Sequence, residues 1–215
     1  MNTSVMNNTP IHNFWQLVSD NADQLRTLVD EESVLAQELL DEVQDQLSEM
    51  DPHLTVFCAR DEAGTGIELV FGCDGYNQSI DTVLFLVAAA PELSNIKILA
   101  FNPRVEHIPE AIEVGDAVLE LDELFFGLRN IGEELHLDLY LDELPIVDDA
   151  PQTDAVLMFL DAIVGEYDLM TRIHSVNWLD LPEDPLDYGL KPLIELRQQF
   201  DLLRSKRPAL GEALH

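Results

Sequence analysis

Apolar residues recur at three- and four-residue steps through residues 13–50, and no proline or glycine interrupts them. This spacing predicts amphipathic helix, because residues three and four apart share one face. The polar cluster DEES at 30–33 indicates a kink or break at which a second helix would start. Asp51-Pro52 ends the pattern, since the residue before a proline avoids the helical region.

A hairpin, a helix and a third strand are predicted next. Runs rich in β-formers at 54–60 and 66–73 flank the turn residues DEAGTG, which is typical of a hairpin. An apolar stripe runs through 77–90 at helical spacing and stops at a proline. The almost wholly apolar stretch 96–101 then predicts a buried strand. The order of these elements is β-β-α-β.

The same order is predicted a second time after a connection at 104–122, which holds a short strand at 117–119. The predicted elements are strands 124–129 and 135–142, helix 153–164 and strand 169–178. A proline-rich connection and an amphipathic helix at 190–205 close the chain. The strand 135–142 alternates strictly, so that its two faces differ. One face would carry Leu135, Leu137, Leu139 and Leu141, and the other His136, Asp138, Tyr140 and Asp142.

The two units also share residues at equal spacing. The matches are Asp81, Val83 and Leu84 with Asp154, Val156 and Leu157 at an interval of 73 residues, and Phe57 and Arg60 with Phe126 and Arg129. We therefore predict an α+β fold built on a duplicated β-β-α-β unit, with ferredoxin-like elements and flanking N- and C-terminal helices.

The predicted organisation has four segments. They are an N-terminal helical segment 1–52, a first unit 53–104, a connection and second unit 105–181, and a C-terminal helix and tail 182–215. Together they are expected to form one compact domain. The pattern leaves open whether the two units share one six-stranded sheet or pack as two subdomains.

Charge narrows the possible partners. Asp and Glu number 42 and Lys and Arg only 11, for a net charge of −31. Nucleic acid and anionic membrane surfaces would be repelled, so neither is expected as a partner. The charge is compatible with a basic protein as the partner. Whether the chain also forms a homodimer is left open. A host-wide adaptation to salt is an alternative source of the acidity.

The sequence predicts a cytoplasmic protein. No apolar run approaches the roughly 20 residues that span a bilayer, and the N-terminus lacks the basic start and apolar block of a secretory signal. A hairpin turn near residues 63–64 would place Cys58 opposite residue 69 or 70, too far from Cys73 for a disulfide. Both cysteines are therefore expected to be reduced thiols.

Candidate chemistry is sparse. The sequence has no phosphate-binding glycine loop, nucleophile elbow, HExxH or CxxC motif, and no cofactor or catalytic residue is predicted. His136 and Asp138 on the polar face of strand 135–142 could share a divalent cation or act as an acid–base pair. A solvated sheet face explains the same alternation. Glu166 and Asp168 in GEYD are expected in a solvated turn, or bound to Arg172 or a cation.

Two short motifs resemble those of an uncharacterised family of bacterial proteins. In that family an AAP motif precedes a strand that ends in AFxPR, and an LDxxxGExD motif follows the second hairpin. The matching positions here are Ala89, Ala90, Pro91, Ala100, Phe101, Pro103 and Arg104, then Leu160, Asp161, Gly165, Glu166 and Asp168. The resemblance covers most of residues 14–204 and implies no known activity.

These observations favour a non-catalytic interaction or regulatory protein that presents an acidic surface to a basic protein partner. One alternative is a metal-dependent enzyme or metal-binding domain that uses the face with His136 and Asp138. A second alternative is a structural homo-oligomer. The lack of a catalytic motif favours the first hypothesis over the enzyme.

Overall fold

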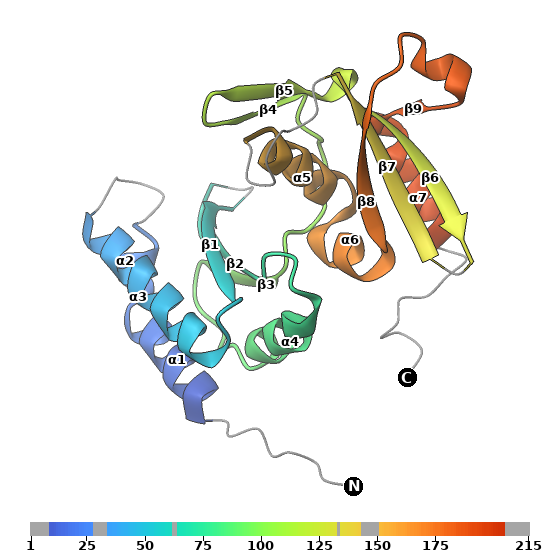
Figure 1. The fold of residues 1–215 in the computed structure, drawn as a ribbon. Helices are drawn as coiled ribbons and strands as arrows, with labels where there is room; N and C mark the ends of the chain where they lie inside the picture. Colours follow the sequence, from blue (N-terminus) through green and yellow to red (C-terminus); the bar gives the residue numbers. More distant parts are fainter. Residues whose placement is uncertain (1–8, 28–33, 62–63, 133, 143–150, 205–215) are drawn as a thin grey trace, which may run out of the picture. The chain divides into compact units, whose positions relative to one another are not determined.

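The fold is α+β, and the chain divides into two compact units, residues 1–101 and 102–215. The computed structural model describes residues 9–27, 34–61, 64–132, 134–142 and 151–204 (Figure 1). The predicted break at DEES lies outside these residues. That the whole chain forms one compact domain stays a prediction.

Three helices open the first unit: α1 (Thr9–Asp20), α2 (Ala22–Leu25) and α3 (Val34–Met50). The predicted apolar stripe faces inward on α3, where Leu39, Val43 and Leu47 are buried. The helix prediction for 13–50 is therefore confirmed for most of its length. It missed the interruption after Asp20, which the sequence marks with no proline or glycine.

A three-stranded sheet follows, in the order β1-β2-β3. Its strands are β1 (Thr55–Arg60), β2 (Ile67–Gly72) and β3 (Ile96–Ala100), and α4 (Ile80–Ala88) connects the last two. β1 pairs with β2 antiparallel and β3 with β2 parallel. Cys58 lies opposite Leu69, as the turn position predicted.

Three aromatic rings pack against one another in the core of the first unit. Trp15 on α1 meets Phe14 and Phe71 edge-to-face, with centroids 5.0 and 5.4 Å away. Its indole N–H donates to the carbonyl of Leu86 at 2.9 Å. A buried tryptophan needs such an acceptor. Trp15 thus joins α1 to α4 through this hydrogen bond and to β2 through its contact with Phe71.

The second unit contains two sheets. A hairpin pairs β4 (Ala111–Val114) with β5 (Ala117–Glu120), and a four-stranded sheet has the order β8-β7-β6-β9. The larger sheet comprises β6 (Phe125–Ile131), β7 (Glu134–Leu141), β8 (Ser175–Asp180) and β9 (Lys191–Pro192). Its helices are α5 (Pro151–Val164), α6 (Glu166–Arg172) and α7 (Leu196–Arg204). The units therefore do not share one six-stranded sheet.

The strand predicted at 169–178 is wrong in its first half. Residues up to Arg172 form helix α6, and the strand begins at Ser175. Gly165 has φ +89°, which only glycine adopts easily, and it lets a new helix start directly after α5. An ion pair between Asp168 and Arg172, one helical turn apart, stabilises that helix.

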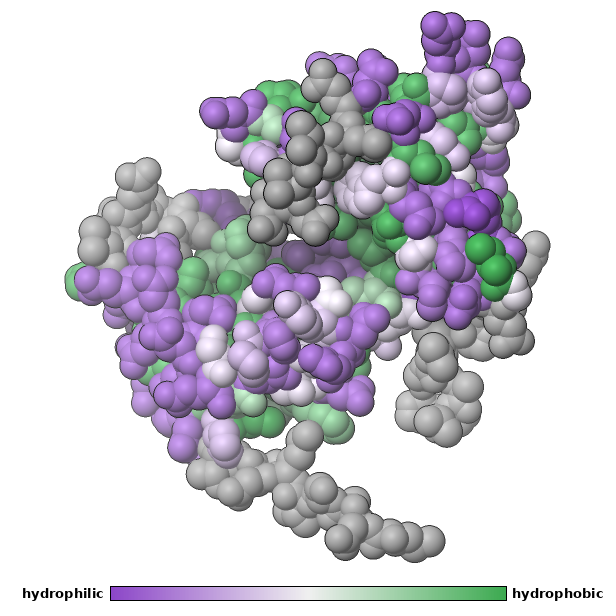
Figure 2. Space-filling model, in the orientation of Figure 1, coloured by the Kyte–Doolittle hydropathy of each residue, from purple (hydrophilic) through white to green (hydrophobic). Residues whose placement is uncertain are grey.

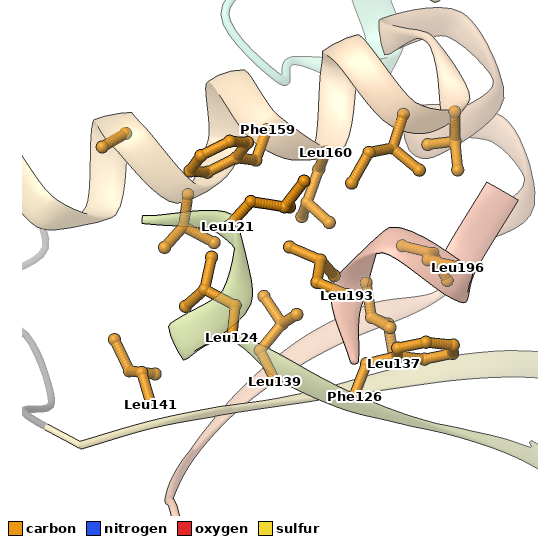
Figure 3. Close-up of a cluster of buried hydrophobic side chains, with 14 of the residues drawn as sticks. Leu121, Leu124, Phe126, Leu137, Leu139, Leu141, Phe159, Leu160, Leu193 and Leu196 are labelled. Atoms are coloured by element: carbon orange, nitrogen blue, oxygen red, sulfur yellow. The ribbon is translucent and has the colours of Figure 1, made fainter. Parts of the chain in front are cut away.

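The core of the second unit lies between β7, α5 and α7 (Figure 3). The predicted apolar face of β7 points into it, and Leu137 and Leu139 are fully buried. Phe159 and Leu160 from α5 and Leu196 from α7 face them. The alternation in 135–142 is thus confirmed.

The two units share one local order of elements, although the second unit has a further strand, β9, and a separate hairpin, β4–β5. In each, a hairpin precedes a helical crossover to a third strand that pairs parallel with the second. Leu84 and Leu157, which match in the sequence, are each 39% exposed. Phe57 is 60% exposed, however, whereas Phe126 is 1% exposed, so these two phenylalanines do not play equivalent roles. Duplication stays a prediction.

Among the described residues, none of the helices is long and apolar enough to cross a membrane.

Candidate functional site

Asp138 is the centre of the polar face of β7. It is only 4% exposed, and its carboxylate accepts hydrogen bonds from Arg129 on β6, through Nε and, at 2.7 Å, through Nη2. Asn177 on β8 donates a further bond at 2.8 Å. The carboxylate is thus engaged by two neighbouring strands.

This pairing keeps both groups charged. The hydrogen bonds from Arg129 hold the pKa of Asp138 below its usual value, although burial opposes this shift. The same bond raises the pKa of the Arg129 guanidinium. A carboxylate fixed in this way is a poor general base, because its lone pairs are already occupied.

His136, two residues before Asp138 on β7, belongs to a different set of contacts. Its Nδ1 lies 2.8 Å from the hydroxyl of Ser175 on β8. Its Nε2 lies 3.7 Å from Oε2 of Glu134, and Nδ1 of His174 lies 3.5 Å from Oε1 of the same glutamate. The two imidazole rings are 5.1 Å apart. Two histidines therefore share one carboxylate.

The sequence hypothesis paired His136 with Asp138 as metal ligands. The structure places both on the predicted face, but it directs Asp138 to Arg129 and His136 to Ser175 and Glu134. In the part of the chain that the structure describes, no group of three His, Cys, Asp or Glu side chains could hold a metal ion. Sequence reasoning missed the contact of His174 with Glu134, because it depends on the parallel register of β7 and β8.

Asn102 of the AFNPR segment and Glu166 of the GEYD segment meet in the second unit. Glu166 Oε2 accepts hydrogen bonds from the backbone N–H and the side-chain amide of Asn102, at 2.8 and 3.0 Å. The N–H of Glu166 donates back to the carbonyl of Asn102 at 2.9 Å. The expectation of a solvated turn at GEYD is therefore wrong for Glu166.

Asp168 is likewise paired, as the alternative with Arg172 predicted. Arg172 Nε donates to it at 2.6 Å, and Nη2 of Arg104 lies 3.8 Å away. Arg104 also binds Asp201 on α7, at 2.9 Å. A chain of alternating charges thus connects the AFNPR segment to α6 and α7.

Arg197 on α7 stabilises the C-terminal end of α5. Its guanidinium donates to the carbonyls of Ala162 and Ile163 at 2.8 and 2.9 Å, and to Val105 at 2.7 Å. The last carbonyls of a helix have no partner within the helix and attract positive charge. The sequence offered no signal for this contact, because the residues are distant along the chain.

Asp161, on α5, is a carboxyl whose proton affinity is strongly perturbed. Burial, with a smaller contribution from the charge of Glu166, raises its pKa from 3.8 to about 7. Such a group changes charge near neutral pH. We assign it no catalytic role.

The first unit presents an acidic surface on α3. We define the α3 acidic face as Glu38, Asp41, Glu42, Asp45 and Glu49, which are all exposed. Their spacing places them on one side of the helix, opposite the buried leucines. No basic residue occurs between Val34 and Met50. Figure 2 shows a mainly hydrophilic surface over this helix.

Comparisons with family models, with curated proteins and with solved structures found no match. The resemblance of the AFxPR and LDxxxGExD segments to an uncharacterised family stays a prediction.

Proposed function

We propose that the protein is a non-catalytic interaction or regulatory protein whose α3 acidic face binds a basic protein partner. The observation that carries this proposal is the row of five exposed carboxylates on α3, without a basic residue among them. Such a row produces a negative potential that accelerates encounter with a positively charged surface.

The arrangement on α3 is unfavourable for the helix itself. Glu38 and Glu42, Asp41 and Asp45, and Asp45 and Glu49 are like charges one turn apart, and each such pair costs about 0.2–0.5 kcal/mol. Glu49 also lies in the last turn, where the helix dipole disfavours negative charge. A face arranged for stability would carry alternating charges, so a function in binding or solubility is the better account.

The arginines of the second unit support the proposal indirectly. Arg104, Arg129 and Arg172 bind carboxylates of their own unit, and Arg197 binds backbone carbonyls. These cations are thereby engaged within that unit. Within α3 itself, no basic residue is present to neutralise the acidic face.

We place this interaction in the cytoplasm. Neither of the two described cysteines forms a disulfide; Cys58 is half-buried and Cys73 is buried, which suits a reducing compartment.

Affinity capture from a lysate of the source organism tests the proposal. The bait is the full chain, compared with a variant that neutralises α3 (Glu38→Gln, Asp41→Asn, Glu42→Gln, Asp45→Asn). The matched control removes four exposed charges from the second unit (Glu113→Gln, Asp116→Asn, Glu120→Gln, Asp122→Asn). We expect the wild-type chain and the control to capture the same basic protein, and the α3 variant to lose it.

The dependence of capture on ionic strength distinguishes this result from other outcomes. Capture should weaken strongly as ionic strength rises toward about 1 M, where the screening length falls to about 3 Å. Equal loss with both variants would indicate unspecific charge attraction and contradict the proposal. An empty eluate, together with a solution mass well above 24.2 kDa, would favour the structural homo-oligomer instead.

A further inference from the structure

β1 is an edge strand of the first unit, and its outer side is only partly covered. β2 pairs with it on one side, and no strand in the described part of the chain pairs with it on the other. Between Thr55 and Ala59, β1 carries no charged residue and no proline. Sheets normally protect an open edge with such residues, because its unpaired N–H and C=O groups attract another strand.

Two contacts show which backbone groups of β1 face outward. The side-chain amide of Gln44 on α3 accepts a hydrogen bond from the N–H of Val56 at 3.1 Å and donates one to the carbonyl of Leu54 at 2.8 Å. The N–H of Asp61, directly after β1, points the other way and donates to the carbonyl of the residue before β2 at 3.0 Å. Since backbone groups alternate in direction along a strand, the N–H and C=O of Cys58 point to the open edge.

Gln44 replaces a neighbouring strand at the start of β1 only. Its contacts with Leu54 and Val56 are those that one residue of a parallel strand makes. Among the residues that the structure describes, none makes such a bond to the backbone of Cys58. The edge is therefore closed at Val56 and open at Cys58.

The two sides of this open edge differ in character. Phe57 is 60% exposed on one face of the sheet. Val56 lies on the opposite face beside its partner Phe71, which packs on α1. α3 contacts both α1 and β1, and it runs in the direction opposite to β1 (Figure 1). Asp41, exposed one turn before Gln44, therefore lies toward the part of the edge that follows Val56.

We propose that an extended segment of the basic partner, in which basic and apolar residues alternate, pairs with β1 at this open edge. Its apolar side chains would pack on Phe57, and its basic side chains would face Asp41 and the rest of the α3 acidic face. Main-chain hydrogen bonds provide affinity in this mode of binding, and the alternating side chains provide specificity.

Charge selects this occupant over a second copy of the chain, because each copy carries a net charge of −31 and the two would repel each other. The inference rests on the proposed function and deepens it, since it states how the basic partner is held beside α3.

NMR titration of the full chain with a synthetic peptide tests the pairing. The probe is an acetylated peptide of about eight residues in which lysine and valine alternate. We expect saturable binding at submillimolar concentration and slower hydrogen exchange of the Cys58 N–H. The N–H of Ala59 pairs with β2 and should exchange slowly with or without the peptide. Cys58→Pro removes the outward N–H and should weaken binding at least about tenfold relative to Cys58→Ala.

Methylation of the peptide's backbone nitrogens distinguishes strand pairing from charge attraction without any change to the protein. One peptide is methylated at every valine nitrogen and another at every lysine nitrogen, and both keep the charge of the parent. One of the two should bind at least about tenfold more weakly while the other binds as the parent does, because only alternate N–H groups of a strand face its neighbour.

Three results would overturn the inference. Equal binding of both methylated peptides would mean that charge alone holds the peptide, in which case the proposed function stands without the strand pairing. Failure of the parent peptide to bind would overturn the pairing only, because affinity capture with the α3 variant decides the proposed function separately. Protection of the Cys58 N–H in the free chain, rising with protein concentration, would assign the edge to a second copy.

Discussion

The side-chain carboxylate of Glu166 holds Asn102 by two hydrogen bonds, of 2.8 and 3.0 Å, across 64 positions of the chain. Together with the bond from the N–H of Glu166 to the Asn102 carbonyl, this contact fixes the start of the second unit on the α5–α6 corner. Asn102 of the AFNPR segment and Glu166 of GEYD thus have a structural role.

Replacing Glu166 by Ala should destabilise the protein. The variant loses both side-chain hydrogen bonds to Asn102, and each typically contributes about 0.5–1.5 kcal/mol. We expect the free energy of unfolding in urea to fall by about 1–2 kcal/mol. Glu183→Ala, at an exposed position of the same unit, is the control and should change it by less than about 0.5 kcal/mol. Equal effects of the two substitutions would show that the contact contributes nothing.

Asp161 should make stability depend on pH. Its folded pKa is raised from 3.8 to about 7, so its contribution to stability is complete below pH 3.8 and is lost as pH rises through about 7. Asp161→Asn removes this loss. We expect the variant to be more stable than the wild type at pH 8, by up to a few kcal/mol at about 1.4 kcal/mol per pKa unit, and the difference to vanish near pH 4.

Urea denaturation at several pH values measures this difference. Asp154→Asn, an exposed acid in the first turn of the same helix, is the control and should show no such pattern. A gain for Asp161→Asn that is independent of pH would contradict the assigned cause.

The sequence predicted the local pattern better than the contacts between distant residues. Strict alternation identified both faces of β7, and the turn position predicted that Cys58 lies opposite Leu69. Residues 169–172 of α6 were predicted as strand and residues 166–168 as a turn, because the helix depends on a glycine with positive φ and on one ion pair within the helix. Neither the glycine nor the ion pair changes the spacing of apolar residues, from which the strand was predicted.

The candidate sites were predictable only in part. His136 was identified from its place on the polar face. Its neighbours Ser175 and His174 lie at the start of β8 and directly before it, and the sequence does not specify the register of that strand. The contacts of Arg104 and Arg197 span more than 30 residues and leave no periodic signal. The α3 acidic face was not predicted, although the helical spacing of its carboxylates would have revealed it.

Leu137→Ala and Leu139→Ala should each destabilise the second unit strongly. Both side chains are fully buried between β7 and α5, so truncation loses burial and leaves a cavity. The expected cost is about 2–5 kcal/mol in urea denaturation. Ile131→Ala on β6, where the side chain is 52% exposed, should cost clearly less. A cost below about 1 kcal/mol for both leucines would mean that β7 does not form this core.

Cys58 should react slowly with thiol reagents in the folded protein. Burial raises its pKa to about 11, so that at pH 8 roughly one molecule in a thousand carries the reactive thiolate. Alkylation by iodoacetamide, followed by mass spectrometry of a Cys73→Ala variant, isolates the rate of Cys58. We expect labelling to accelerate strongly in urea, and equal rates in the folded and unfolded chain would contradict its half-buried position.

Site-specific photo-crosslinking tests the central claim, that the α3 acidic face contacts a basic protein, most directly. A photoreactive amino acid replaces Gln37 or Ser48, exposed neighbours of the face, or Val118 on β5 as a control in the other unit. After irradiation in lysate of the source organism at low salt, we predict a crosslink to one basic protein from Gln37 and Ser48 and none from Val118. A crosslink to that protein from Val118 alone, or no crosslink from either α3 position, would contradict the account.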